Sequence, residues 1–350
     1  MNQSSFIPNG CLKTDQKLRY RRKISRGKDL QADLKAFEPQ HEFLVGIDSD
    51  GCAFNSMEVK HNDSFSVNLI KYFGLAAISR QVHQVWDFVN LYSKTRGINR
   101  FKAIILAFDF LSQMPKVKRT GVQIPSLPYL REWTETETKL GNPVLDQVIK
   151  KSTGARLKEL SQVMEWSLDV NKTISEIVYN LPPFPYVCQS LQQLVGKVDM
   201  IVVSATPYEA LKREWDEHNI SQYVALIAGQ EMGSKSEHLS IVAKGRYAAD
   251  RIIMIGDSPG DLKAAESVEA LFFPVNPGYE EESWQNFLEQ GIGKFLGGTY
   301  KGAYEGKLIA EFDVLLPEDP PWDLGGELYS KFFESGCKIL ANYLFCEGYE

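Results

Sequence analysis

Two aspartates, Asp48 and Asp50, are the residues whose types and spacing most directly suggest chemistry. They follow the apolar run 43–47, which predicts a buried parallel strand, and they precede Gly51, which lets the backbone turn sharply. Open α/β sheets bind their ligands at the carboxyl ends of the strands. Two carboxylates there repel each other unless a cation lies between them or one holds a proton. The alternative is an ordinary polar turn, in which Asp and Gly are common.

Ser204 lies at the end of a second strand-like segment, 198–203. Thr206 and Glu209 have the spacing of a capping box, with a proline at the first helical position, so a helix is expected to begin here. The unpaired N–H groups of its first turn would form an anion site beside the Ser204 hydroxyl. Taken alone, the pattern also fits an ordinary strand-to-helix turn.

Lys235 follows a third strand-like segment, 223–228, and lies in the first turn of a helix that Ser234 and Glu237 are expected to cap. The helix dipole disfavours a cation in that turn. A bound anion therefore explains the lysine better than helix stability does, although a solvated surface lysine is the alternative.

Two more carboxylates, Asp257 and Asp261, follow the strand-like segment 251–255. Asp261 has the spacing of a capping residue for the helix that Ser258 begins. Asp257 stands directly at the strand end and has no such structural explanation.

Together these residues resemble the four motifs of the haloacid dehalogenase-like (HAD) hydrolase superfamily. The resemblance covers about residues 41–54 and 185–276, and it is closest to the phosphoglycolate phosphatase and β-phosphoglucomutase branch, with an enlarged helical cap. The four motifs occur in the family's order: Asp48-Ser49-Asp50-Gly51, then Ser204, then Lys235, then Asp257 with Asp261.

The resemblance implies a role for each of these residues. Asp48 would attack phosphorus and form an aspartyl-phosphate. Mg²⁺ would be bound by Asp48, Asp257 and the backbone carbonyl of Asp50. Ser204 and Lys235 would bind the phosphate oxygens, and Asp261 would orient Lys235 or a metal-bound water from further out.

Asp50 distinguishes branches of this superfamily. It would protonate the leaving oxygen and then take a proton from the hydrolytic water. A departing halide needs no proton, whereas a departing alkoxide does. The carboxylate therefore favours phosphate esters over the dehalogenases, and over the phosphonate-cleaving members, which have an apolar residue at this position.

Strand-like segments that alternate with helical patterns predict a Rossmann-like parallel α/β sheet. About 150 residues separate Asp48 from the second strand, whereas a parallel crossover needs only a dozen or so. The excess is helical in pattern and predicts an inserted all-helical cap. The expected organisation is a basic N-terminal extension (1–40), an α/β core (41–54 plus 185–280), the cap (55–184) and a helical C-terminal extension (281–350).

Composition narrows the class of protein. The chain has 350 residues, 43% hydrophobic and 24% charged, with a net charge of −6, which gives no general reason to expect nucleic-acid binding. Its five cysteines include no Cys-x-x-Cys pair that would suggest a zinc site. It has no apolar signal-peptide core and no membrane-spanning run, so a cytoplasmic location without a membrane partner is expected. The basic segment 1–40 is interpreted as a solvated extension, the alternative being an arm for nucleic acid or anionic membrane.

Three functions remain open. The first is a Mg²⁺-dependent phosphatase acting on a small phosphorylated metabolite, which a mobile cap would enclose. The second is a phosphomutase, which would return the phosphoryl group to the sugar. The third is a non-catalytic binding protein that kept the fold. Five residues are considered as contacts for a second anionic group of the substrate, against the alternative of solvated helix ends: Phe54, Asn55, Lys94, Arg96 and Arg100.

Overall fold

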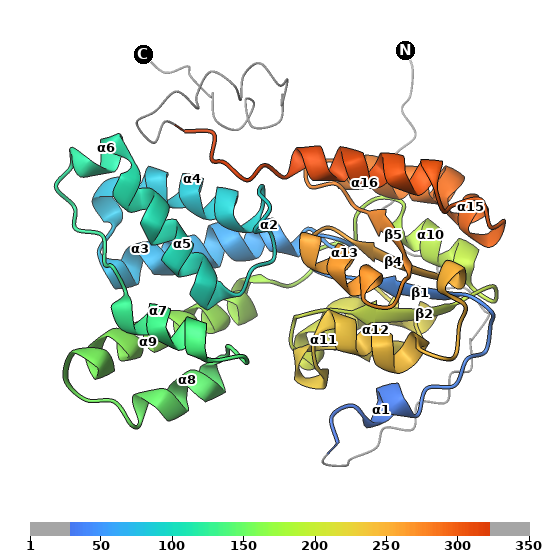
Figure 1. The fold of residues 1–350 in the computed structure, drawn as a ribbon, viewed down its shortest axis with the longest axis horizontal. Coiled ribbons are helices and arrows are strands. Elements are labelled where there is room, and N and C mark those ends of the chain that lie inside the picture. The colour runs from blue at the N-terminus through green and yellow to red at the C-terminus, as the bar shows by residue number, and fades with distance from the viewer. Residues whose placement is uncertain (1–28, 323–350) are drawn as a thin grey trace. The chain divides into compact units, whose positions relative to one another are not determined.

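The computed structural model describes residues 29–322, and these form two compact units (Figure 1). Predictions for most of the basic N-terminal extension and for the end of the C-terminal extension lie outside the described residues. The first unit comprises 29–57 and 179–314, and the second comprises 58–178 and 315–322.

The first unit is built on a five-stranded sheet in the order β3-β2-β1-β4-β5. Every pairing is parallel, so the predicted parallel α/β fold is confirmed. The central strands are buried and consist mainly of Val, Ile, Leu and Met, as expected for strands covered on both faces. The strands are β1 (Leu44–Ile47), β2 (Asp199–Val203), β3 (Leu226–Ala228), β4 (Ile252–Gly256) and β5 (Leu271–Pro274).

The register of the sheet brings several strand ends level. Ile47, the last residue of β1, lies opposite Val202 of β2 and Ile255 of β4. The residues that follow these three strands therefore emerge at the same edge, where a parallel sheet places its ligands.

Helices cover both faces of the sheet. Val45 and Ile47 pack with Trp215 and Trp284 in the main core, while the next residue along the strand, Gly46, faces the other way. A Cβ on Gly46 would come within 3.0 Å of Leu239, so a helix packs closely on that face. The helices of this unit are α1 (Ala32–Lys35), α10 (Val187–Leu194), α11 (Tyr208–Glu217), α12 (Lys235–Ala243), α13 (Pro259–Glu266), α14 (Glu280–Asn286), α15 (Ile292–Leu296) and α16 (Ala303–Leu315).

The second unit is helical, and residues 58–178 contain no strand. Its core is rich in aromatic side chains, with Trp86 and Trp166 fully buried and in edge contact at 6.0 Å. Its helices are α2 (Ser56–Lys60, which begins at the unit boundary), α3 (Ser66–Phe73), α4 (Ser79–Asn90), α5 (Arg100–Gln113), α6 (Pro115–Lys118), α7 (Pro128–Thr136), α8 (Asn142–Ile149) and α9 (Gly154–Ile177), and a π-helical turn (His61–Phe65) joins α2 to α3.

The segment after α16 also packs into the helical unit. Trp322 lies edge-on against Phe88 at 5.2 Å and Phe110 at 5.9 Å, and the Lys94 N–H donates to the Pro317 carbonyl at 3.1 Å. The chain thus returns to this unit after completing the sheet. Across residues 29–322, no helix is both long and apolar enough to cross a membrane.

Candidate active site

Asp48 stands directly after β1, and its backbone extends the parallel ladder by donating to the Ile255 carbonyl at 2.9 Å. The residue is 4% exposed. Oδ1 accepts the Ser49 N–H at 2.8 Å, and Oδ2 lies 2.6 Å from Nζ of Lys235. Both carboxylate oxygens are therefore held, and one of them faces an ammonium group.

Lys235 is the first residue of α12, after a capping box formed by Ser234 and Glu237 as the sequence predicts. Its ammonium bonds Asp48 and also Asp261, whose Oδ1 is 2.7 Å away. Burial by itself lowers the pKa of Lys235, but the carboxylates of Asp261 and Asp48 outweigh it and raise the pKa above its ordinary value. The lysine is therefore a permanent cation, and its partners explain a positive charge in the first turn.

Asp257 and Asp261 follow β4, and both are buried. Oδ2 of Asp261 accepts the N–H of Ser258 at 3.1 Å and its hydroxyl at 2.6 Å, while Oδ1 binds Lys235. Asp261 thus caps α13 and orients the lysine. A Cβ on Gly256 would lie only 2.3 Å from Asp261, so glycine is required there for this side chain to approach.

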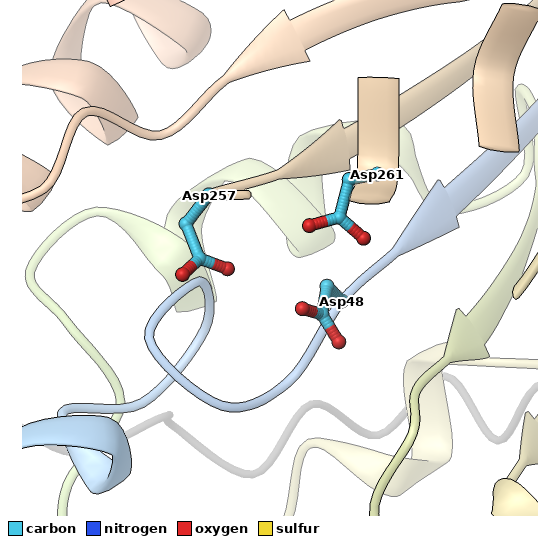
Figure 2. A group of neighbouring side chains, drawn as sticks. All are labelled: Asp48, Asp257 and Asp261. Atoms are coloured by element: carbon cyan, nitrogen blue, oxygen red, sulfur yellow. The ribbon is translucent and has the colours of Figure 1, made fainter. Parts of the chain in front are cut away.

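Asp48, Asp257 and Asp261 form one acidic cluster, with an oxygen of each within 4.8 Å of the others. Figure 2 shows the three carboxyl groups facing one another from the ends of β1 and β4 and the start of α13. Burial raises the pKa of the Asp48 carboxyl well above its ordinary value, Asp261 and Asp257 add to the effect, and Lys235 opposes it. Three carboxylates against one ammonium leave an excess of buried negative charge. Oxygen donors with that excess suit a hard dication.

The Asp50 side chain lies outside this cluster. Gly51, at φ +76°, turns the chain, and the Asp50 carboxylate accepts hydrogen bonds from the hydroxyls of Ser56 and Thr206. The predicted capping role of Thr206 is wrong, because Pro207 occupies the N-cap position of α11 and the threonine hydroxyl binds Asp50 instead.

Ser204 follows β2 at the same sheet edge and is 2% exposed. Its N–H continues the ladder to Ala228 at 3.1 Å, and its hydroxyl accepts the Thr206 N–H at 3.2 Å. The Thr206 carbonyl in turn accepts from Gln230 at 3.0 Å, which joins the loop after β2 to the loop after β3. Ser204 is connected to Asp50 through Thr206.

Three of the five residues considered for a second anionic group of the substrate contact other residues of their own unit. Phe54 is fully buried and packs edge-on against Trp215 at 5.9 Å. Arg96 is 5% exposed and donates to the Leu91 carbonyl at 2.7 Å. Arg100 donates to Asn171 at 2.7 Å. Both guanidinium groups donate hydrogen bonds within the helical unit, and a substrate contact by either of them stays a prediction.

Similar solved structures are HAD hydrolases, whereas neither a protein-family model nor a curated protein matches the chain. A haloacid dehalogenase-like hydrolase from Streptococcus pneumoniae has 12% identity and a TM-score of 0.37, covering 69% of this chain and 90% of its own. A HAD-superfamily hydrolase from Geobacter sulfurreducens has 14% sequence identity and a TM-score of 0.36, and the match covers 68% of this chain and 90% of that protein. A predicted phosphoglycolate phosphatase from Haemophilus somnus has 15% sequence identity and a TM-score of 0.36, and the match covers 67% of this chain and 86% of that protein. Values this low do not indicate what this chain acts on.

The four groups of polar residues each follow one strand of the sheet. A parallel five-stranded sheet carries an acidic strand end at β1, a hydroxyl after β2, a lysine after β3 and two aspartates after β4. These residues therefore follow the strands in the order that the resemblance to the haloacid dehalogenase-like hydrolases implies.

Proposed function

We propose that this protein is a Mg²⁺-dependent phosphatase that hydrolyses a small phosphorylated metabolite. The observation that carries the proposal is the Lys235 ammonium, which lies 2.6 Å from Oδ2 of Asp48 at the edge of a buried acidic cluster. A phosphate group and a carboxylate nucleophile repel each other, so attack requires positive charge at the point of approach. Lys235 supplies part of that charge, fixed in place by Asp261.

The reaction divides into two displacements. In the first, an Asp48 carboxylate oxygen bonds to phosphorus as the bond to the leaving oxygen breaks, and Asp50 donates a proton to that oxygen. In the second, water attacks phosphorus, Asp50 takes the water's proton, and inorganic phosphate leaves with Asp48 restored. The hydroxyls of Ser56 and Thr206 hold the Asp50 side chain in one orientation for both proton transfers.

The phosphate oxygens need donors during both displacements. Lys235 and the Ser204 hydroxyl would bind them, because both groups emerge at the sheet edge that carries Asp48. Mg²⁺ would be held by Asp48, Asp257 and the Asp50 carbonyl, with Asp261 behind Lys235. Bound there, the ion would offset the repulsion among carboxylates and phosphate and polarise the phosphoryl group.

A phosphate-release screen tests the function. It covers sugar phosphates, phosphoglycolate, nucleotides and amino-acid phosphates, with Mg²⁺ and after chelation. Asp48→Asn and Asp50→Asn should each lower release by about 10³-fold or more in a folded protein. Asp250→Asn, which changes an exposed carboxylate before β4, should have no effect. Asp48→Asn protein that releases phosphate at the wild-type rate would refute the nucleophile assignment, and isomer formation without release would identify a phosphomutase.

A further inference from the structure

Ser49, the residue between the two motif aspartates, makes a set of contacts that the proposed reaction does not explain. Side chains alternate along an extended chain, so Ser49 points away from the side on which Asp48 lies. Its hydroxyl is fully buried. It donates to Oε2 of Glu214 at 2.9 Å and accepts the indole N–H of Trp215 at 2.9 Å. Two consecutive residues of α11 thus hold this hydroxyl between them.

The backbone of Ser49 connects that contact to both neighbours. Its N–H donates to Oδ1 of Asp48 at 2.8 Å. Its carbonyl accepts from the N–H groups of Ala53 at 2.9 Å and Phe54 at 3.1 Å, which closes the turn after the second aspartate. A shift of Ser49 would therefore move the Asp48 carboxylate and the following turn together.

The helix α11 is a firm support for this contact. Trp215 is fully buried and lies edge-on against Phe54 at 5.9 Å. The loop that leads into the same helix carries Thr206, which binds the Asp50 side chain. One helix and its lead-in therefore hold both Ser49 and Asp50.

We propose that Ser49, Glu214 and Trp215 form a positioning element for the nucleophile. The element fixes the Ser49 peptide so that its N–H holds Oδ1 of Asp48, and this leaves Oδ2 directed at Lys235. The inference rests on the proposed function and adds three positioning residues to it. Loss of the element would let the carboxylate rotate, and misplacement of a reacting group by about 1 Å can cost on the order of 100-fold in rate.

A purely structural role for these residues makes a different prediction. Burying a polar group costs free energy unless the group is hydrogen-bonded, and an apolar side chain of similar size fills a core equally well. If Ser49 only filled space, Ser49→Ala would change stability and leave the turnover of the folded protein unchanged. Ser190 provides the matched control, because it is also a fully buried serine of the sheet-containing unit and its Oγ has no hydrogen-bond partner among the described residues.

The kinetic test uses p-nitrophenyl phosphate with Mg²⁺. The p-nitrophenolate leaving group of this substrate departs without protonation, so the rate reports attack by Asp48 more than proton transfer by Asp50. Ser49→Ala and Glu214→Leu should lower kcat by about 10- to 100-fold with KM changed by less than about 3-fold. Glu214→Gln keeps an acceptor oxygen and should stay within about 3-fold of wild type, as should Ser190→Ala. Wild-type kcat in Ser49→Ala, or an equal loss in Ser190→Ala, overturns the proposal.

A second readout separates this proposal from the proposed function. Crystal structures of the wild-type and Ser49→Ala proteins show the Asp48 carboxylate whether or not phosphate is released. If the positioning element acts as proposed, the Asp48 side chain turns away from Lys235 or takes several orientations in Ser49→Ala, and it does neither in the wild-type protein. An unchanged, single orientation overturns it. A wild-type protein that releases no phosphate from any ester overturns the proposed function, while the structures still decide the role of Ser49.

Discussion

Replacing Gly256 with alanine should damage the site through a single steric contact. The added Cβ would lie 2.3 Å from both Cβ and Cγ of Asp261 and 2.7 Å from its Oδ2. Carbon atoms that are not bonded settle near 3.5–4.0 Å, so Asp261 must move by more than about 1 Å. That movement breaks its bonds to Ser258 and to Lys235, which are 2.6 and 2.7 Å long. We expect unfolding free energy to fall by about 1–3 kcal/mol and kcat to fall by about 100-fold.

The assay for Gly256→Ala combines urea unfolding with phosphate release. Gly306→Ala is the matched control, because Gly306 is an exposed residue of α16 with nothing within 4 Å of an added Cβ, and it should gain about 0.5–1 kcal/mol. In an Asp261→Gly background the clashing side-chain atoms are gone, so the stability loss from Gly256→Ala should shrink. A Gly256→Ala protein as stable and active as wild type would refute the steric reasoning, and so would an undiminished loss in the Asp261→Gly background.

Four further predictions concern other parts of the molecule. Asp199→Ala should cost about 3 kcal/mol, measured by urea unfolding, because its buried carboxylate accepts from the N–H groups of Gln40 and His41 and from a tyrosine hydroxyl; a loss below about 1 kcal/mol contradicts this. Burial lowers the pKa of His238 from 6.5 to about 4. As pH falls, the unfolded chain therefore takes up a proton on this residue before the folded protein does. The free energy of unfolding should fall by about 3 kcal/mol between pH 6.5 and pH 4, and the fall over the same range should be smaller in His238→Phe. Trp322→Ala should expose residues 58–178 to limited proteolysis, whereas Trp322→Phe should protect them, since the ring contacts two phenylalanines of that unit. Mg²⁺ at about 100 times its Kd should raise the free energy of unfolding by about 2.7 kcal/mol, and Asp257→Asn should lose most of that gain.

Much of the sheet and part of the site could be predicted because their signals are local. Each strand is an apolar run of a few residues, and each run ends in a residue that the parallel arrangement brings to one edge. The capping box at Ser234 is likewise contained in four consecutive residues and forms as expected. Convergence of Asp48, Lys235 and Asp257 is then expected from the parallel arrangement alone, because the carboxyl ends of parallel strands meet at one edge of a sheet.

The remaining contacts could not be predicted because they join distant parts of the chain. Thr206 reaches Asp50 across 156 residues of sequence, and Glu214 reaches Ser49 across 165. Which side chain of α11 meets the loop after β1 depends on how that helix is rotated and packed on the sheet. The spacing of Thr206 and Glu209 favours a helix cap, and only the tertiary structure gives the hydroxyl a stronger acceptor. The same limit applies to Trp322, whose aromatic partners lie on α4 and α5.

Repulsion within the acidic cluster opposes folding, and hydrogen bonds and the Lys235 ammonium offset part of it. Like charges in a buried site destabilise the compact state, and hydrogen bonds that do not depend on a bound cation offset part of that cost for two of the three carboxylates. Asp48 has the Ser49 N–H, and Asp261 has the N–H and hydroxyl of Ser258. Lys235 is placed by the capped start of α12 and neutralises one of the three carboxylates. Because each support arises within a loop or helix start at a strand end, the oxygens are already gathered within 4.8 Å, and a dication that binds there meets a preorganised set of donors.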